Sequence, residues 1–219
     1  LASAVETAYE PWPDAVRAEV PVNATVPAVT AEQVAGILAR FPGCRTAKVK
    51  VAEQGQDLAA DIARVRAVRA ELGDDALVRI DANGGWSVNQ AITALRTLAE
   101  FDLDYAEQPC ATVPELVAVR EALGGSTSPV RIAADESVRK AEDPLAVARS
   151  GAADLLILKA QPLGGIPRAL DIVEQAGLPV VVASALDTSA GIAMGLHLAA
   201  ALPSGVLAGA CGLGTVALL

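Results

Sequence analysis

Histidine, cysteine and aromatic side chains are scarce in this sequence. Its 219 residues include one histidine, three cysteines and only 3% aromatic residues. The cysteines, Cys44, Cys110 and Cys211, are odd in number and widely spaced, and they form no CxxC motif and no cluster with histidine. A disulfide framework and a zinc site are therefore not indicated, and a reducing cytoplasm is the simplest expected location.

Positive charge and long apolar runs are also in short supply. The formal net charge of −9 and the isoelectric point near 4.6 argue against nucleic acid or an anionic membrane as a partner. An anionic substrate would need local lysines, arginines or a cation. The longest apolar stretch, 190–202, contains His197 and is shorter than the roughly 20 residues of a membrane span. The chain begins at Leu1 without a signal-type region, so we do not expect residue 1 to be the biological start.

Alanine, valine and leucine are abundant, and 53% of the residues are hydrophobic. Short apolar or β-branched runs predict strands, and segments with a period near 3.6, such as 57–72 and 87–101, predict helices between them. The predicted strands are 19–26, 46–51, 77–81, 103–107, 130–135, 155–159 and 179–183, with an eighth at 206–210. Three helix starts carry the capping-box pattern: Thr30 with Gln33, Ser87 with Gln90, and Thr112 with Glu115.

Strands and helices alternate throughout, which predicts an α/β fold built from parallel βαβ units. The number of strands favours a (β/α)8 TIM-type barrel over residues 19–219. A doubly wound open sheet is the alternative, but no predicted strand is followed by its GxGxxG phosphate-binding motif. Residues 1–18, with two prolines around Trp12, are expected to lead in from a preceding part of the protein.

Five of the predicted strands end in a charged residue: Lys50, Asp81, Glu107, Asp135 and Lys159. Consecutive members are 31, 26, 28 and 24 residues apart, the length of one βα unit. We expect these side chains to form a ring at the barrel mouth, where active sites of this fold lie. Alternation along a strand places Lys48 on the same face as Lys50. It likewise places Arg79 and Asn83 on the face of Asp81.

The three carboxylates of this ring predict a metal site. Asp81, Glu107 and Asp135, if they converge, repel one another by roughly several kcal/mol per pair at an effective dielectric constant near 20. A hard divalent cation removes the conflict, and Mg²⁺, with Mn²⁺ as a possible substitute, suits an all-oxygen site. Lys50 and Lys159 would flank it as general bases, because neighbouring positive charge and partial dehydration lower the pKa of a lysine. Such a site would stabilise the enediolate formed when a proton leaves the carbon α to a carboxylate.

These residues lie in five motifs that resemble the enolase superfamily, in its muconate-lactonizing-enzyme subgroup. The motifs, in chain order, are TAKVKV at 46–51, RIDANG at 79–84, AEQP at 106–109, ADES at 134–137 and LKAQPLGG at 158–165. Each motif alone is weakly specific, whereas five in order at this spacing are highly specific. The resemblance runs from about Val20 to Thr215 and is closest to the actinobacterial-type o-succinylbenzoate synthases.

The resemblance implies an activity and roles for the ring residues. It implies Mg²⁺-dependent dehydration of a small anionic carboxylate, 2-succinyl-6-hydroxy-2,4-cyclohexadiene-1-carboxylate, to 2-succinylbenzoate, a step in menaquinone synthesis. Lys50 would remove the proton and return it to the departing hydroxyl, with Lys48 supporting it. Lys159 would stabilise the enediolate. The implied Mg²⁺ ligands are Asp81, Glu107 and Asp135.

The resemblance also implies substrate-binding positions around this centre. Arg79 and Asn83 resemble residues near the substrate carboxylate and the metal. The loop after the seventh strand, with Ser184 and Ser189, resembles the one that holds the succinyl tail. Gly212 and Gly214 would close the site from the eighth strand. Family members carry an α+β capping domain over the barrel mouth, which we expect to be largely absent from this chain, and residues 1–18 resemble the exit from it.

Three other readings stay open at this point. An N-succinylamino acid racemase or a dipeptide epimerase would use the same metal and both lysines. A Schiff-base lyase would use Lys159 or Lys50 as a nucleophile on the same fold. A metal-binding barrel fragment would not turn over substrate. The oligomeric state is left undetermined.

Other polar residues receive no function. We expect His197, between two leucines of an apolar helix, to be a packed or capped histidine. Charged residues along 57–72 are expected to form an ordinary exposed helix face: Asp61, Arg64, Arg66, Arg69 and Glu71. Three further acidic residues are expected to have structural roles: Glu136, Asp154 and Asp187.

Overall fold

Parallel strands and helices alternate along the chain in the computed structural model, which describes residues 12–140, 143–185 and 187–215. The strands are β1 (Ala24–Val26), β2 (Thr46–Lys50), β3 (Leu77–Asp81), β4 (Leu103–Glu107), β5 (Arg131–Ala134), β6 (Leu155–Leu158) and β7 (Val180–Val182). The α-helices are α2 (Val34–Leu38), α3 (Leu58–Leu72), α4 (Val88–Leu98), α5 (Val113–Ala122), α6 (Asp143–Ser150), α7 (Ile166–Ala176) and α8 (Ser189–Ala201). Short 3-10 helices are η1 (Ala31–Gln33), η2 (Ala99–Phe101), η3 (Gly125–Thr127) and η4 (Glu136–Val138).

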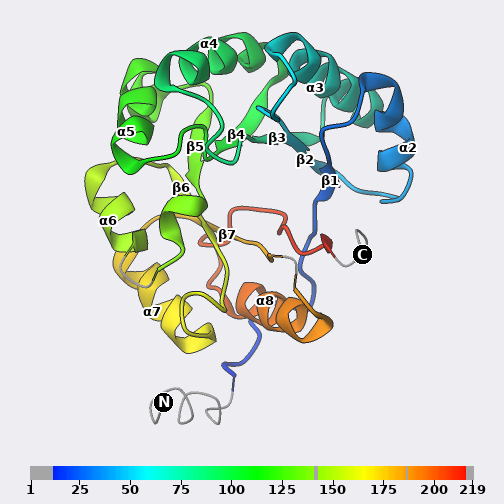
Figure 1. The fold of residues 1–219 in the computed structure, drawn as a ribbon. Helices are drawn as coiled ribbons and strands as arrows, with labels where there is room; N and C mark the ends of the chain where they lie inside the picture. The colour runs from blue at the N-terminus through cyan, green and yellow to red at the C-terminus, as the bar shows by residue number, and fades with distance from the viewer. Residues whose placement is uncertain (1–11, 141–142, 186, 216–219) are drawn as a thin grey trace.

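The seven strands form one parallel sheet in which every strand pairs with its neighbours in the sequence. The sheet curls, and the helices surround it (Figure 1). This arrangement confirms the predicted α/β barrel architecture. The register aligns Lys50 with Asp81, and Asp81 with Glu107, across adjacent strands. The charged ends of three strands therefore lie at one level of the sheet.

The predicted eighth strand at 206–210 is wrong as a regular strand within the described residues. Isolated bridges instead join Leu207 to Val180 and Cys211 to Val22. The Cys211 N–H donates to the carbonyl of Pro21 at 2.7 Å. Two glycines with positive φ, Gly205 at 85° and Gly209 at 98°, bend this segment out of a continuous pleat. The segment still occupies the place between β7 and β1 and closes the ring.

The first strand is shorter than the predicted 19–26, beginning only at Ala24. Pro21 and Pro27 bracket it and have no N–H to donate to a ladder, which accounts for the difference. The predicted helix starts are confirmed, because η1, α4 and α5 each begin with a complete capping box. Gly73 and Gly177 end α3 and α7 as their C-caps.

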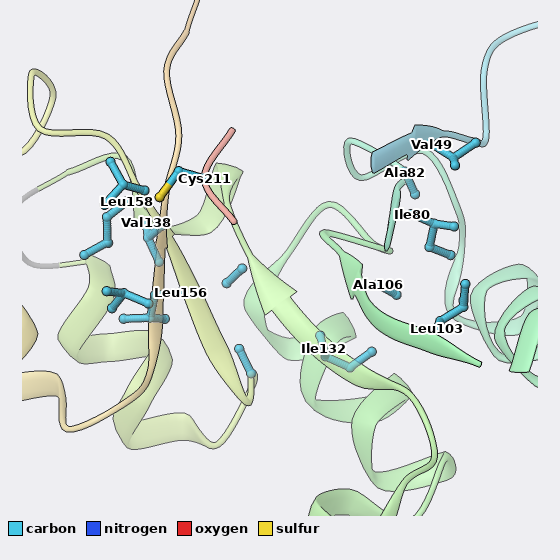
Figure 2. Close-up of a cluster of buried hydrophobic side chains, with 14 of the residues drawn as sticks. Val49, Ile80, Ala82, Leu103, Ala106, Ile132, Val138, Leu156, Leu158 and Cys211 are labelled. Carbon is cyan, nitrogen blue, oxygen red and sulfur yellow. The ribbon is translucent and has the colours of Figure 1, made fainter. Parts of the chain in front are cut away.

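Strand alternation divides the core into two layers. Outward-facing side chains from successive strands, among them Val49, Ile80 and Ala106, pack in one cluster beneath the helices (Figure 2). Their sequence neighbours face the barrel interior, where Tyr105 and Ile157 belong to a separate, smaller cluster. Each Val or Ile that anchors a helix is therefore flanked by residues that point into the barrel. This alternation places the lysines next to Val49 on the interior face.

The segment that precedes the barrel packs against α8. His197 Nε2 lies 2.9 Å from the carbonyl oxygen of Pro13, and its ring contacts that of Trp12 at a centroid distance of 4.8 Å. Arg17 donates to the carbonyl of Leu202 at 2.9 Å. His197 is thus packed and hydrogen-bonded, as predicted. The remainder of the predicted lead-in, residues 1–11, lies outside the described residues.

No helix in the described ranges combines the length and the hydrophobicity that crossing a membrane requires.

A buried ion cluster lies within the barrel below the strand ends. Arg79 is completely buried, and its Nε donates to Asp104 Oδ2 at 2.8 Å. Its Nη1 donates to the carbonyl of Ala210 at 2.6 Å, and its guanidinium lies 4.7 Å from the ring centroid of Tyr105. Arg131 also pairs with Asp104. Arg79 therefore ties β3 to β4 and to the irregular eighth segment.

We expect Arg79→Met to lower the free energy of unfolding by about 3 kcal/mol or more, because it leaves Asp104 short of a partner and the Ala210 carbonyl buried without a donor. Urea denaturation measures this. Arg66→Met is the matched control, since Arg66 and Glu100 are both largely exposed and 3.9 Å apart. The control should cost about 1 kcal/mol or less. Equal losses in the two variants would contradict a structural role for the buried cluster.

Candidate active site

A cavity of about 500 Å³ opens at the carboxyl ends of the strands. Most of the predicted site residues line it: Lys48, Lys50, Asp81, Asn83, Asp135, Lys159, Ser184 and Gly212. They come from β2, β3, the ends of β5, β6 and β7, and the irregular eighth segment. The structure therefore brings side chains from positions 48 to 212 together at one mouth, where the fold places active sites.

Two lysines of β2 hold the carboxylates of the next two strands. Lys48 Nζ lies 3.0 Å from Asp81 Oδ2 and 2.9 Å from Glu107 Oε1. Lys50 Nζ lies 2.6 Å from Asp81 Oδ2 and donates to Asn83 Oδ1 at 2.8 Å. Asp81 and Glu107 are almost completely buried, so these ion pairs form in a medium of low dielectric constant.

Lys159 stands on the other side of the cavity. It follows β6 and pairs with Asp135, which follows β5. Three strands separate β2 from β6 in the sheet order, so Lys50 and Lys159 approach the cavity from opposite sides. A molecule between them would have one ammonium or amine group near each of its two faces.

Charge is unevenly distributed among these groups. Burial raises the pKa of Glu107 to about 8, and the carboxylates of Asp81 and Asp135 add to the effect, while Lys48 opposes it. Burial also disfavours ionised Asp81, but Lys48 and Lys50 hold the pKa of that carboxyl well below its usual range. Although burial opposes its charged form, the carboxylates of Glu107 and Asp81 hold the pKa of Lys48 well above its ordinary value. Lys48 therefore stays cationic at neutral pH and is unsuited to be a base.

Three residues just beyond strands β2, β3 and β4 have left-handed backbone conformations without being glycine. They are Ala52, Asn83 and Gln108, with φ of 60°, 45° and 38°. Such conformations are unfavourable for residues with a Cβ, and they persist only where surrounding contacts hold them. The chain thus turns sharply after each of three charged strand ends at the mouth.

The prediction of an ordinary exposed face on 57–72 is wrong for Asp61 and Arg64, which are 2% and 1% exposed. Arg64 Nη1 donates to the carbonyl of Lys50 at 2.8 Å, and Asp61 Oδ2 accepts from the N–H of Ala52 at 3.0 Å. Arg64 Nη1 and Asp61 Oδ1 also form an ion pair at 2.9 Å. The spacing of these residues indicated burial, because Asp61 and Arg64 lie four residues and one residue before Val65, on the buried face of α3. Together they fix the backbone that carries Lys50.

Some predicted residues do not reach the cavity lining. Arg79 lies beneath it in the buried ion cluster, bonded to Asp104, and is not among the lining residues. Glu107 lies behind Lys48. Ser189 is the first residue of α8, and neither it nor Gly214 is among the lining residues. The structure therefore does not bring Arg79, Ser189 and Gly214 together with the rest.

Ser184 and Gly212 do meet at the cavity. Ser184 Oγ donates to the carbonyl of Gly212 at 3.1 Å and lies 2.8 Å from Thr215 Oγ1. The bond fixes the loop after β7 against the eighth segment. The hydroxyl groups of Ser184 and Thr215 therefore line this side of the cavity.

Sequence reasoning missed several lining residues: Thr25, Glu136, Arg139, Gln161 and Asp187. Glu136 connects to a predicted site residue, because its Oε1 accepts from Asn83 Nδ2 at 3.1 Å and from Arg139 at 2.8 Å. Its position directly after Asp135, a predicted site residue, was the sequence feature that could have indicated this. The purely structural role expected for Glu136 and Asp187 is thus incomplete, since both face the cavity.

Among the residues that the structure describes, no group of three or more Asp, Glu, His or Cys side chains is arranged to hold a metal ion. The physical reason is that each predicted ligand faces a lysine. Lys48 and Lys50 hold Asp81, Lys48 holds Glu107, and Lys159 holds Asp135. The metal-ligand role of the three carboxylates stays a prediction.

Glu107→Gln is expected to remove a pH dependence of stability. The folded chain keeps a proton on Glu107 up to pH 8, whereas the unfolded chain releases it near 4.5, so this group costs stability as pH rises between those values. In EDTA, the free energy of unfolding should be lower at pH 8 than at pH 6 by on the order of 2 kcal/mol. Asp81 does not contribute in this window, because its pKa lies below it.

Urea denaturation at intervals from pH 5 to pH 8 measures the slope. In Glu107→Gln, the free energy of unfolding should not show this decrease with rising pH, since the glutamine side chain does not titrate. An unchanged slope in the variant would show that Glu107 ionises normally in the folded chain.

A family model described as Enolase C-terminal domain-like matches residues 30–210. An o-succinylbenzoate synthase from Mycolicibacterium smegmatis is 60% identical over 216 residues, which are 98% of this chain and 64% of that protein. The chain therefore spans less than two thirds of the length of this relative.

Solved structures are similar over the same region. Muconate cycloisomerase from Pseudomonas fluorescens matches with a TM-score of 0.79 and 30% identity, over 94% of this chain and 56% of that one. A dipeptide epimerase from Enterococcus faecalis, complexed with Mg and the dipeptide L-Leu-L-Tyr, matches with a TM-score of 0.74 and 29% identity. That match covers 94% of this chain and 56% of the epimerase.

Proposed function

The chain belongs to the Enolase C-terminal domain-like family, and we propose that it is the barrel part of an o-succinylbenzoate synthase. The reaction is the dehydration of 2-succinyl-6-hydroxy-2,4-cyclohexadiene-1-carboxylate to 2-succinylbenzoate. One observation carries the proposal, namely that Lys50 and Lys159 face one cavity from opposite sides beside three carboxylates. The 60% identity to the mycobacterial synthase supports the choice of substrate within the family.

The donor set fits a hard divalent cation, which we propose to be Mg²⁺, with Mn²⁺ as a possible substitute. Asp81, Glu107 and Asp135 are acidic groups on successive strands, and the repulsion among them contributes to the raised pKa of Glu107. A cation would relieve that repulsion, and oxygen ligands suit Mg²⁺. When bound, it would supply positive charge to the substrate carboxylate and so make the adjacent C–H more acidic. A related epimerase structure that contains Mg supports this identity.

Lys50 performs the proton transfers in the proposed mechanism. Its amine takes the proton from the ring carbon α to the carboxylate, and the electrons of that C–H bond form the enediolate. The same ammonium then gives the proton to the departing hydroxyl as the C–O bond breaks, so water leaves and the amine is restored. One base suffices, because both groups leave from one face of the ring.

The other polar residues hold charge and position. Lys159 places positive charge near the enediolate from the opposite face. Lys48, held cationic by its carboxylate partners, keeps Asp81 and Glu107 in place. Asn83 accepts a hydrogen bond from Lys50 and so orients it. Ser184 and Gly212 line the side of the cavity proposed for the succinyl tail, while substrate contacts by Arg79, Ser189 and Gly214 find no support in the lining.

We also propose a cytoplasmic location, which is supported by the free thiols of Cys44, Cys110 and Cys211.

Lys50→Ala and Lys159→Ala are each expected to lower dehydration by at least about 10³-fold in the protein that contains this chain, because one removes the proposed proton carrier and the other removes positive charge beside the enediolate. Ultraviolet absorbance follows formation of the aromatic product. Lys140→Ala is the matched control, since Lys140 is exposed and lines no part of the cavity. Its activity should stay within about twofold of the unaltered protein. Full activity in either site variant would refute the assigned roles.

The substrate class is tested with the same protein and metal. Dehydration should proceed with the cyclohexadiene carboxylate and exceed any racemisation of N-succinyl amino acids or epimerisation of dipeptides. Racemisation without dehydration would replace the synthase by one of those activities.

EDTA should abolish turnover, and Mg²⁺ should restore it, because the proposed cation makes the C–H next to the substrate carboxylate more acidic. Trapping with borohydride and a carbonyl substrate distinguishes the alternative. Covalent labelling of Lys50 or Lys159, together with activity in EDTA, would indicate a Schiff-base lyase instead.

A further inference from the structure

Gln108 follows the carboxylate of Glu107 and uses all of its hydrogen-bonding groups on neighbouring strand ends. The residue is completely buried. Its Oε1 accepts from the backbone N–H of Asp135 at 3.0 Å and from that of Ser137 at 3.3 Å. Its Nε2 donates to the carbonyl of Cys110 at 2.9 Å and to Ser137 Oγ at 2.7 Å. One side chain therefore holds the segment that follows β5 against the loop that follows β4.

The surrounding groups determine the orientation of the amide. Two N–H donors converge on one end of the side chain, so that end must be the oxygen. The carbonyl of Cys110 accepts only, so the other end must be the NH₂ group. In a flipped amide, the NH₂ group would face the two backbone N–H groups, and the oxygen would face the carbonyl of Cys110. These buried polar groups would then be left without partners.

The backbone of Gln108 adds a bond to β5 itself and extends the network to the turn after β3. Its N–H donates to the carbonyl of Ala133 in β5 at 2.8 Å. Its carbonyl accepts from the N–H of Gly84 at 2.7 Å, in the turn that follows Asp81 and Asn83. The left-handed φ of 38° allows the side chain and the carbonyl to reach opposite neighbours. This strained conformation is held in place by bonds on every side.

We infer that Gln108 is the positioning residue that sets the relative places of Asp81, Glu107 and Asp135. It is bonded covalently to Glu107, it holds the backbone N–H of Asp135, and it holds the turn that follows Asp81. This inference rests on the proposed function, in which those three carboxylates bind the cation. Gln108 itself contacts neither cation nor substrate in this assignment.

We expect loss of Gln108 to change both the affinity of the site for Mg²⁺ and its preference for Mg²⁺ over Ca²⁺. Mg²⁺ requires near-ideal octahedral geometry with short bonds, whereas Ca²⁺ accepts longer and less regular ones. Loosening the strand ends should therefore weaken Mg²⁺ binding more than Ca²⁺ binding. Loss of a residue that orients ligands typically costs 10- to 100-fold in metal affinity.

Gln108→Met tests the inference, because methionine has a similar length and volume but makes none of the four side-chain bonds. Binding of Mn²⁺ to the purified chain is measured by electron paramagnetic resonance, with Mg²⁺ and Ca²⁺ as competitors. We expect the affinity for Mn²⁺ and Mg²⁺ to fall about 10- to 100-fold and the ratio of Ca²⁺ to Mg²⁺ affinity to rise. Thermal unfolding in EDTA shows separately what the change costs in stability.

Gln90→Met is the matched control, since Gln90 also accepts from a backbone N–H, that of Ser87 at 3.0 Å, but at the exposed start of α4. It should leave both metal affinities unchanged. Ser137→Ala removes only one bond of Gln108, and it should shift the Ca²⁺ to Mg²⁺ ratio in the same direction by a smaller factor. This milder variant decides the matter if the methionine variant does not fold.

The outcomes separate the two proposals. Unchanged Mg²⁺ affinity and an unchanged ratio in folded Gln108→Met would overturn the positioning role while leaving the cation site intact. A lower melting temperature with an unchanged ratio would also overturn it, since a purely structural residue behaves in this way. Asp135→Asn removes a proposed cation ligand and should weaken Mn²⁺ binding. Absence of Mn²⁺ binding by the unaltered chain, or unchanged binding by Asp135→Asn, would overturn the cation site and this inference with it.

Discussion

Mutual repulsion among buried carboxylates is the constraint on which the barrel mouth depends. Asp81 and Glu107 are adjacent in register and almost fully buried, so neither can be ionised without a nearby positive charge. Lysine supplies it. The chain has only four lysines against thirteen arginines, and three of the four lie at this mouth. One arginine, Arg139, also lines the cavity, and Arg79 lies below it, where a permanent charge and a planar group satisfy fixed partners.

Much of the fold and of the site was predictable because it depends on local periodicity. Alternation along β2 and β3 determined which residues face inward, and the recurring βα length showed that the charged ends share one level. Asp61 and Arg64 were misjudged because charged residues on a helix are usually exposed, although their spacing matched the buried stripe of α3. Periodicity shows which face a residue lies on. It does not show whether a loop covers that face.

Contacts between residues that lie far apart in the chain could not be predicted from the sequence. The shape of the segment from Leu207 to Gly212 depends on bonds to β1 and β7, whose residues lie far away in the chain. The place of Arg79 beneath the cavity depends on Asp104 and on the carbonyl of Ala210, and neither position could be inferred from the motif around Asp81. Gln108 stood in a recognised motif, but its role rests on five partners in three different segments.

Ring closure by the eighth segment has a consequence for how the protein is made. The bridge between Val22 and Cys211 joins residues at nearly opposite ends of the chain. The barrel therefore cannot close until the segment around Cys211 has been synthesised, long after Val22, and contacts of such sequence separation form slowly. Until then, β1 and β7 are open sheet edges, which can pair with other chains. Nascent chains that stall before residue 211 are thus the ones most exposed to aggregation and most in need of chaperones.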